Sequence, residues 1–256
     1  MRGGPRRPGR ASGRRGPRGL AAFLGAVVLA GLALILAGGQ SIGPCLVSEF
    51  RYQQARDAHD AMDAGGSSEK EARKWDDPNQ AAWLSVDGTP IDYPVAQGAK
   101  QEPGFYLAHD LWGQPSQVGC PYLDWRCSVA DTHALIYGHR VGTTDLQFSP
   151  IANAWDQGVF DALGAATLET RTGTKSYVPC FALKVDKSYE QIQRFSMNRD
   201  ELRSWLEDML GEASAASPLA QDLCRHATKA LTLATCASSQ AGQRERTLLV
   251  FVGTSA

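Results

Sequence analysis

The sequence lacks the short spacings by which small motifs hold metal ions. Its six cysteines include no Cys-x-x-Cys pair, and its five histidines include no His-x-x-x-His pair. Structural zinc sites usually take their ligands from such pairs. We therefore expect no structural zinc in this chain.

The chain also has almost no overall charge, with 26 basic and 27 acidic residues and a formal net charge of −1. The charge is unevenly placed, because residues 1–19 contain seven arginines and no acid. A basic tail on an acidic body is not typical of a nucleic-acid-binding domain. It indicates that the two ends of the chain lie in different compartments.

No charged or strongly polar residue interrupts residues 20–37, which read LAAFLGAVVLAGLALILA. A run of about 18 apolar residues can cross a bilayer as a helix, and arginines on its N-terminal side keep that side in the cytoplasm. We expect a cytoplasmic tail at residues 1–19, a single-pass membrane anchor at 20–38 and an extracellular body. A cleaved signal peptide is the alternative, since small residues follow the run.

Residues 39–74 are polar and rich in helix formers, which predicts a helical lead-in. From about residue 75 to residue 256, short apolar runs alternate with turn residues, as in mainly β proteins. Phe105–Leu107 is one such candidate strand. Two helices are expected between strands, at residues 151–163 and 198–210. The predicted fold is a closed β-barrel of about eight strands with added helices, since closure removes exposed strand edges.

An extracellular body permits disulfides. Cys120 and Cys127 are close enough in sequence to join across a loop, and Cys180 and Cys224 could link two elements. Sequence alone decides neither pairing.

Three residues at predicted strand ends form a candidate catalytic set. Cys236 follows the apolar run 231–235, His139 follows the run 134–137 and a glycine, and Arg246 opens the last run. A thiol needs a proton acceptor or a cation nearby to become a nucleophile, and histidine supplies either. Arginine can stabilise the oxyanion that forms when an amide is attacked. Each residue alone also suits an ordinary role, such as a buried cysteine or a surface charge.

The order of several motifs resembles the sortase family, most of all class B. Residues 83–95 (WLSVDGTPIDYPV) and 106–110 (YLAHD) resemble the opening of a sortase domain. Residues 136–139 (IYGH) resemble the histidine motif, and 232–236 (TLATC) resemble the cysteine motif. Arg246, ten residues beyond the cysteine, stands where the family's arginine belongs.

The resemblance implies a cysteine transpeptidase without metal or organic cofactor. Cys236 would attack the threonine carbonyl of a C-terminal sorting motif in a secreted protein. Arg246 and the backbone N–H of Ala237 would hold the oxyanion, and His139 would protonate the leaving amine. Thr235 would line the substrate groove or simply pack. An amine of peptidoglycan or of a pilin would then take the acyl group.

Three residues depart from the class B pattern near the site. Arg140 follows the histidine where asparagine is common, Ala234 replaces a frequent serine, and Ala237 replaces a frequently acidic neighbour. The resemblance therefore predicts the reaction more firmly than the substrate preference.

The same residues leave other functions open. A pilin-polymerising sortase would use the same chemistry. A catalytically silent, surface-anchored binding barrel would result if Cys236 were locked in a disulfide. A papain-like hydrolase is disfavoured, because its cysteine usually opens a helix and precedes the histidine in sequence.

Overall fold

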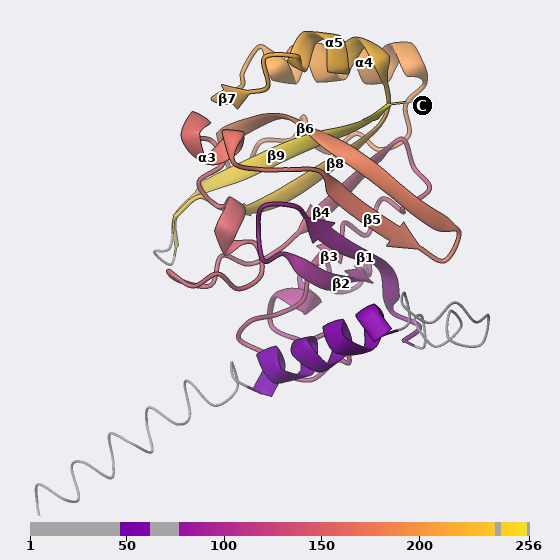
Figure 1. Cartoon of the computed structure of the whole chain (residues 1–256), viewed down its shortest axis with the longest axis vertical. Coiled ribbons are helices and arrows are strands. Elements are labelled where there is room, and N and C mark those ends of the chain that lie inside the picture. Colours follow the sequence, from indigo (N-terminus) through magenta and orange to yellow (C-terminus); the bar gives the residue numbers. More distant parts are fainter. Residues whose placement is uncertain (1–46, 62–76, 239–241, 255–256) are drawn as a thin grey trace, which may run out of the picture. The chain divides into compact units, whose positions relative to one another are not determined.

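The computed structural model describes residues 47–61, 77–238 and 242–254 (Figure 1). The chain divides into two units, Met1–Gly43 and Pro44–Ala256, and every described residue belongs to the second. The predicted cytoplasmic tail and membrane anchor fall outside the described residues. None of the helices within the described ranges is long and apolar enough to cross a membrane.

The body of the molecule is a closed β-barrel. Its strands in chain order are β1 (Gln80–Val86), β2 (Asp92–Gln97), β3 (Tyr122–Leu123), β4 (His133–Tyr137), β5 (Ala166–Thr170), β6 (Gly173–Asp186), β7 (Ala215–Ala216), β8 (Ala227–Cys236) and β9 (Glu245–Thr254). They pair in the order β5-β1-β2-β3-β4-β8-β9-β6-β7, and β5 also pairs with β6. That last pairing closes a ring of eight strands, with β7 added beside β6. The predicted closed barrel of about eight strands is confirmed.

One helix precedes β1, and further helices connect several of the strands. They are the N-terminal helix (residues 47–61), the 3-10 turns η1 (Phe105–Leu107) and η2 (Ser149–Ile151), and the α-helices α3 (Gln157–Asp161), α4 (Arg199–Leu210) and α5 (Ala220–His226). Helices α4 and α5 lie together on one side of the barrel (Figure 1). The helix predicted at residues 151–163 is present only as the short α3, preceded by η2.

The helix predicted at residues 198–210 is confirmed as α4. It begins with a capping box, in which the Asn198 side chain accepts the N–H of Glu201 and the Glu201 carboxylate accepts the N–H of Asn198. These two bonds satisfy donors that a helix start leaves unpaired. Leu202, Leu206 and Met209 are fully buried, because their spacing places them on the face that packs on the barrel.

The strand predicted at Phe105–Leu107 is wrong, since these residues form η1. Its bonds join residues three apart, from the N–H of Leu107 to the carbonyl of Gly104 and from that of Ala108 to Phe105. The His109 ring stacks on Phe105 with a centroid distance of 3.9 Å and an interplanar angle of 2°. This local stacking favours a turn, which a short apolar run does not reveal.

The N-terminal helix packs against the barrel through a buried tyrosine. Tyr52 is fully buried, and its hydroxyl donates to the Gly119 carbonyl at 2.7 Å. Its ring also meets Tyr93 of β2 edge to face, with centroids 5.5 Å apart. Arg51 forms a 2.8 Å ion pair with Asp110, which is buried. The helix is therefore joined to the barrel by packing, a hydrogen bond and an ion pair.

Strands β8 and β9 pair with each other and are buried along most of their length. Along β8 the residues from Ala230 to Thr235 are all buried, and so are those from Thr247 to Gly253 along β9. Such continuous apolar runs are typical of strands covered on both faces. Only the ends of these two strands approach the surface, and Cys236 and Arg246 stand at those ends.

The sulfur atoms of Cys180 on β6 and Cys224 on α5 lie 3.7 Å apart, and both are free thiols in this structure. This is the pair that the sequence allows to link two elements. Cys120 and Cys127 are also free and buried, and they donate to different carbonyls, those of Pro94 and Asp124. No disulfide joins the described cysteines in this structure.

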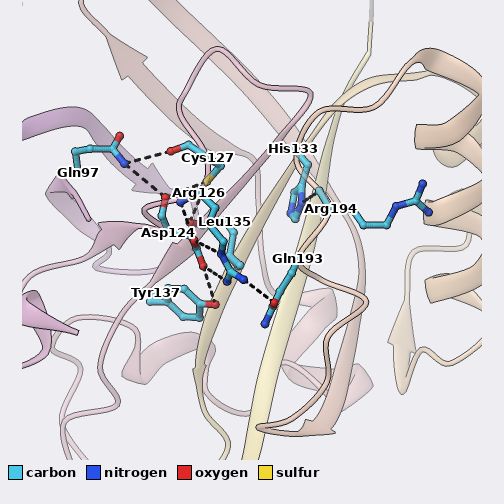
Figure 2. A network of polar contacts seen from close by, with 9 residues as sticks. All are labelled: Gln97, Asp124, Arg126, Cys127, His133, Leu135, Tyr137, Gln193 and Arg194. Atoms are coloured by element: carbon cyan, nitrogen blue, oxygen red, sulfur yellow. Dashed lines mark hydrogen bonds and ion pairs between the residues drawn. The ribbon is translucent and has the colours of Figure 1, made fainter. Parts of the chain in front are cut away.

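His133 is a fully buried core residue at the start of β4. Its Nδ1 lies 2.7 Å from the Arg194 carbonyl (Figure 2), and its Nε2 lies 2.8 Å from the Thr232 hydroxyl. A carbonyl only accepts, so Nδ1 carries a proton, and in the neutral ring Nε2 accepts from the Thr232 hydroxyl. Burial lowers the pKa of His133 to about 4, against which the bond to the Arg194 carbonyl acts weakly.

This burial predicts that the fold loses stability in mild acid. Between pH 7 and pH 4.5 the unfolded chain protonates His133 while the folded chain does not, so the free energy of unfolding falls by about 2–3 kcal/mol from this group. His133→Gln removes that contribution. We expect denaturant unfolding at the two pH values to show a smaller pH effect in this variant than in the wild type.

The exposed His226 supplies the comparison, since His226→Gln replaces a histidine without changing a buried side chain. An unchanged pH dependence in His133→Gln would contradict the buried neutral histidine.

Candidate active site

The register of β8 against β9 places a thiol opposite a guanidinium. Cys236 is the last residue of β8 and pairs directly with Arg246 on β9. Directly paired residues of antiparallel strands project from the same face of the sheet, with Cβ atoms about 5 Å apart. Both residues are partly exposed. The strand pairing alone thus brings these two predicted site residues together.

The parallel pairing of β4 with β8 brings the histidine to the same edge. Tyr137 stands opposite Ala234, and the next N–H, that of Gly138, donates to the Ala234 carbonyl at 3.1 Å. His139 comes two residues after Tyr137, as Cys236 comes two residues after Ala234. Parallel strands keep this spacing, so His139 leaves β4 beside the end of β8. It is partly exposed, like the cysteine.

Gly138 allows the end of β4 and the loop that follows His139 to lie close together. A Cβ built on Gly138 would lie 2.5 Å from the ring of Phe148, which is fully buried. The N–H of Phe148 donates to the His139 carbonyl at 2.9 Å. The loop that follows the histidine therefore folds back onto the strand, and only a glycine leaves room for it.

A backbone carbonyl orients the His139 ring. Its Nε2 lies 2.6 Å from the carbonyl oxygen of Leu107, at the end of η1. Since a carbonyl only accepts, Nε2 carries the proton, and Nδ1 is left to exchange a proton with the thiol or with a substrate. Leu107 was not among the predicted site residues, because its contribution is a backbone atom.

Arg246 is held by its own hairpin. Its Nη1 donates to the carbonyls of Gln243 at 3.1 Å and Glu245 at 3.0 Å. A guanidinium has five N–H donors in a rigid fork, so two bonds made by one nitrogen leave donors for another acceptor. The side chain is thus fixed at one nitrogen and can still bind an anion.

The two neighbours of the cysteine are more enclosed. The N–H of Ala237 donates to the Glu245 carbonyl at 3.1 Å, so the predicted oxyanion role requires this bond to be exchanged for the oxyanion. Thr235 is buried, and its hydroxyl is shielded from solvent without a partner among the described residues. Its side chain points to the face opposite Cys236. This position favours packing over contact with a substrate.

Cys236 differs from the other described cysteines in exposure. Burial raises the pKa of Cys120 to about 12 and that of Cys127 to about 11. Cys180 and Cys224 are buried against each other. A thiolate does not form readily at Cys120 or Cys127, and a substrate does not reach the fully buried Cys180 and Cys224. Cys236, partly exposed beside Arg246, is the one described thiol placed to act as a nucleophile.

A polar network holds the strand pair that carries His139 (Figure 2). The Asp124 carboxylate accepts from Arg126 Nε at 2.8 Å and from the Tyr137 hydroxyl at 3.3 Å. Burial alone would raise the pKa of Asp124, but the hydrogen bonds from Arg126 and Tyr137 outweigh it and lower that pKa. Gln97 joins the network by donating to the Cys127 carbonyl at 3.2 Å. Tyr137, two residues before His139, is therefore firmly placed.

Arg140 also contacts the site, which the sequence did not predict. Arg140 Nη1 donates to the Ala237 carbonyl at 2.5 Å and to Asn153 Oδ1 at 3.2 Å. Within the described residues, no group of three or more His, Cys, Asp or Glu side chains is arranged to hold a metal ion. The side chains gathered at the site are the thiol of Cys236, the imidazole of His139 and the guanidinium groups of Arg140 and Arg246.

Comparisons with known proteins bear on this arrangement. No family model matches the chain. It is 29% identical over 65 residues to Sortase B of Listeria monocytogenes, a match that covers 25% of this chain and only about a quarter of that relative.

Solved structures match far more of the chain. The Staphylococcus aureus sortase B–substrate complex has a TM-score of 0.67 at 17% identity and covers 81% of this chain and 96% of that one. Sortase B of Clostridium perfringens has a TM-score of 0.62 at 23% identity and covers 73% and 100%. The chain therefore has the fold of class B sortases, and the resemblance drawn from its motifs is confirmed at that level.

The packing at Gly138 predicts that a single methyl group disturbs the site. In Gly138→Ala the new Cβ meets the buried Phe148 ring, so the strand end or the loop has to move, at a cost of about 1–3 kcal/mol. We expect a lower unfolding midpoint in denaturant and a displaced His139. A matched control is Gly142→Ala, since a Cβ there meets nothing within 4 Å, although its φ of +58° adds backbone strain.

Two readouts separate packing from conformation. The stability loss of Gly138→Ala should come with a shift of the His139 ring signals in NMR, whereas that of Gly142→Ala should leave those signals in place. Wild-type His139 signals in Gly138→Ala would contradict the close-approach argument.

Proposed function

We propose that this chain is a cysteine transpeptidase of the class B sortase type. The observation that carries the proposal is the pairing of Cys236 with Arg246 across β8 and β9, with His139 at the parallel end of β4. This combination of nucleophile, cation and imidazole stands on a barrel with the class B sortase fold. Neither the constellation nor the fold alone would support the reaction as well.

The first half of the reaction is acylation of the thiol. Nδ1 of His139 takes the proton of the Cys236 thiol, and the sulfur attacks the carbonyl carbon of a threonine in the sorting motif of a secreted protein. The resulting oxyanion is stabilised by the free donors of the Arg246 guanidinium. The carbon–nitrogen bond then breaks, His139 gives its proton to the departing amine, and a thioester remains on the enzyme.

The second half transfers the acyl group. An amine attacks the thioester and gives a proton to His139. The carbon–sulfur bond breaks, and His139 returns the proton to the sulfur, which restores the free thiol. One of the matching structures is sortase B complexed with Gly3. By analogy, we assign the acceptor as an amine of peptidoglycan or of a pilin subunit. No cofactor takes part in this scheme.

The cell surface is the proposed place of action. The arginine-rich tail and the apolar run at residues 20–37 support a single-pass membrane protein with its N-terminus in the cytoplasm. Secreted substrates and cell-wall amines are both accessible there. Intact cells can be treated with a membrane-impermeant thiol reagent or with an added protease. In the proposed orientation, these agents reach the body of the protein and do not reach its N-terminus.

The rival function is a catalytically silent binding barrel. It requires that Cys236 be locked in a disulfide, but this cysteine is a free, partly exposed thiol. Reaction of the folded ectodomain with a thiol reagent should therefore label Cys236 ahead of the buried cysteines. An unreactive Cys236 in protein whose buried cysteines react after unfolding would favour the silent barrel.

Removing the nucleophile is expected to abolish the reaction. Cys236→Ala should show no cleavage of a peptide library that includes Asn-Pro-x-Thr-x motifs, whereas the wild type should cleave at threonine. With oligoglycine or a lysine-bearing peptide added, the wild type should form the joined product. Cys180→Ala is the control, because this thiol is buried away from the site. Undiminished cleavage by Cys236→Ala would reject the proposal.

Removing the oxyanion donor is expected to slow the chemical step. Arg246→Ala should lower kcat by about 100-fold, the usual loss for one such donor, with a smaller change in KM. Arg246→Lys should recover part of the rate, since it keeps the charge and loses the fork.

Arg244→Ala is the matched control on the same hairpin, because Arg244 binds Asp186 with two 2.8 Å bonds and not the site. Equal losses in Arg244→Ala and Arg246→Ala would point to damage of the hairpin instead of a lost donor.

A further inference from the structure

Arg140 joins the two loops that carry the thiol and the imidazole. It directly follows His139, and its Nη1 donates to the carbonyl of Ala237, the residue directly after Cys236. The same nitrogen also donates to Asn153 Oδ1 at 3.2 Å. Hydrogen bonds from a guanidinium are stronger than neutral ones, and this one lies in a part-buried position.

The Ala237 residue is fixed on both of its polar sides. Its N–H donates to the Glu245 carbonyl on β9, and its carbonyl accepts from Arg140. Ala237 itself is 7% exposed. The first residue after the nucleophile is therefore tied to β9 on one side and to the histidine loop on the other.

The base of the histidine loop is rigid enough for Arg140 to act from it. Arg140 and Gln147 form an isolated β-bridge, and the N–H of Phe148 donates to the His139 carbonyl. The N–H of Val141 donates to the Ser149 hydroxyl at 2.8 Å. These bonds hold the backbone of Arg140 in place. Its guanidinium therefore binds the end of β8 from a fixed position in the histidine loop.

A second contact ties the same region to β9. The Thr247 hydroxyl donates to the Ala152 carbonyl at 2.6 Å, in a buried position. Thr247 follows Arg246, and Ala152 precedes the Asn153 that Arg140 binds. The segment from His139 to Asn153 is thus attached both to the nucleophile strand and to the arginine strand.

We propose that Arg140 is a positioning residue that fixes Cys236 relative to His139 by binding the carbonyl of Ala237. The role rests on the proposed transpeptidase function, in which the thiol and imidazole have to exchange a proton. A loss of alignment by about 1 Å can cost such a reaction about 100-fold. Arg140 acts on the geometry of the site and does not itself react.

The proposal predicts a particular kinetic pattern. Arg140→Ala should lower kcat for the sorting peptide by about 10–100-fold while KM stays within about twofold, because the residue places the reacting groups rather than the substrate. Arg140→Lys should recover part of kcat, since an ammonium can still donate to the carbonyl. Asn153→Ala removes only the second acceptor and should lower kcat less than Arg140→Ala does.

Hydrogen exchange tests the same contact without any substrate. Amide exchange in a peptide covering residues 236–238 should accelerate in Arg140→Ala and remain close to wild type in Arg225→Ala, which changes an exposed arginine on α5. A thermal midpoint within a few degrees of wild type would show that the barrel stays folded. If Arg140→Ala does not fold, the Arg140→Lys and Asn153→Ala variants carry the test.

The outcomes separate the two proposals. A wild type that cleaves no peptide would reject the transpeptidase function, while the exchange data would still decide whether Arg140 holds the end of β8. Wild-type kcat and exchange in Arg140→Ala would overturn the positioning role alone. A rise in KM with unchanged kcat would also overturn it, because that pattern belongs to a substrate-binding residue.

Discussion

The register of three neighbouring strands is the constraint on which the site depends. Cys236 faces Arg246 because β8 and β9 pair in that register, and His139 joins them because β4 runs parallel to β8. A slip of one residue would turn the thiol towards the opposite face, where Thr235 now lies buried. The apolar side chains along β8 and β9 resist such a slip, since each is matched to the face it occupies. Core packing and catalytic geometry are thus set by the same pairing.

Backbone groups provide the finer orientation within that register. The Leu107 carbonyl fixes the tautomer of His139, and the Glu245 carbonyl holds Ala237. The Ala237 carbonyl in turn receives Arg140. Carbonyls occur at every residue, so these contacts depend on where the chain runs and less on which side chains it carries. The hydrogen bond from the Tyr52 hydroxyl of the N-terminal helix to the Gly119 carbonyl is another contact of this kind.

The sequence was sufficient for features that local pattern determines. The ends of β4 and β8 and the helix α4 follow from periodicity and turn residues. The closed barrel follows from the many short strands, whose edges closure removes. The turn η1 was missed because a stacked ring pair and not an apolar pattern shapes it. The contacts of Leu107 and Arg140 were missed because their partners lie 32 and 97 residues away. Such contacts arise only once the barrel has closed.

Backbone-directed contacts also explain how this fold can persist at low sequence identity. The chain keeps a TM-score of 0.67 to a class B sortase structure at 17% identity. If pairs of side chains positioned the site residues, a substitution of one member would require a matching substitution of the other. A carbonyl partner needs no such match, so the strand register can be kept while the side chains diverge. Arg140 fits this logic, because its side chain binds the backbone carbonyl of Ala237 and so links the two loops through a group that every residue carries.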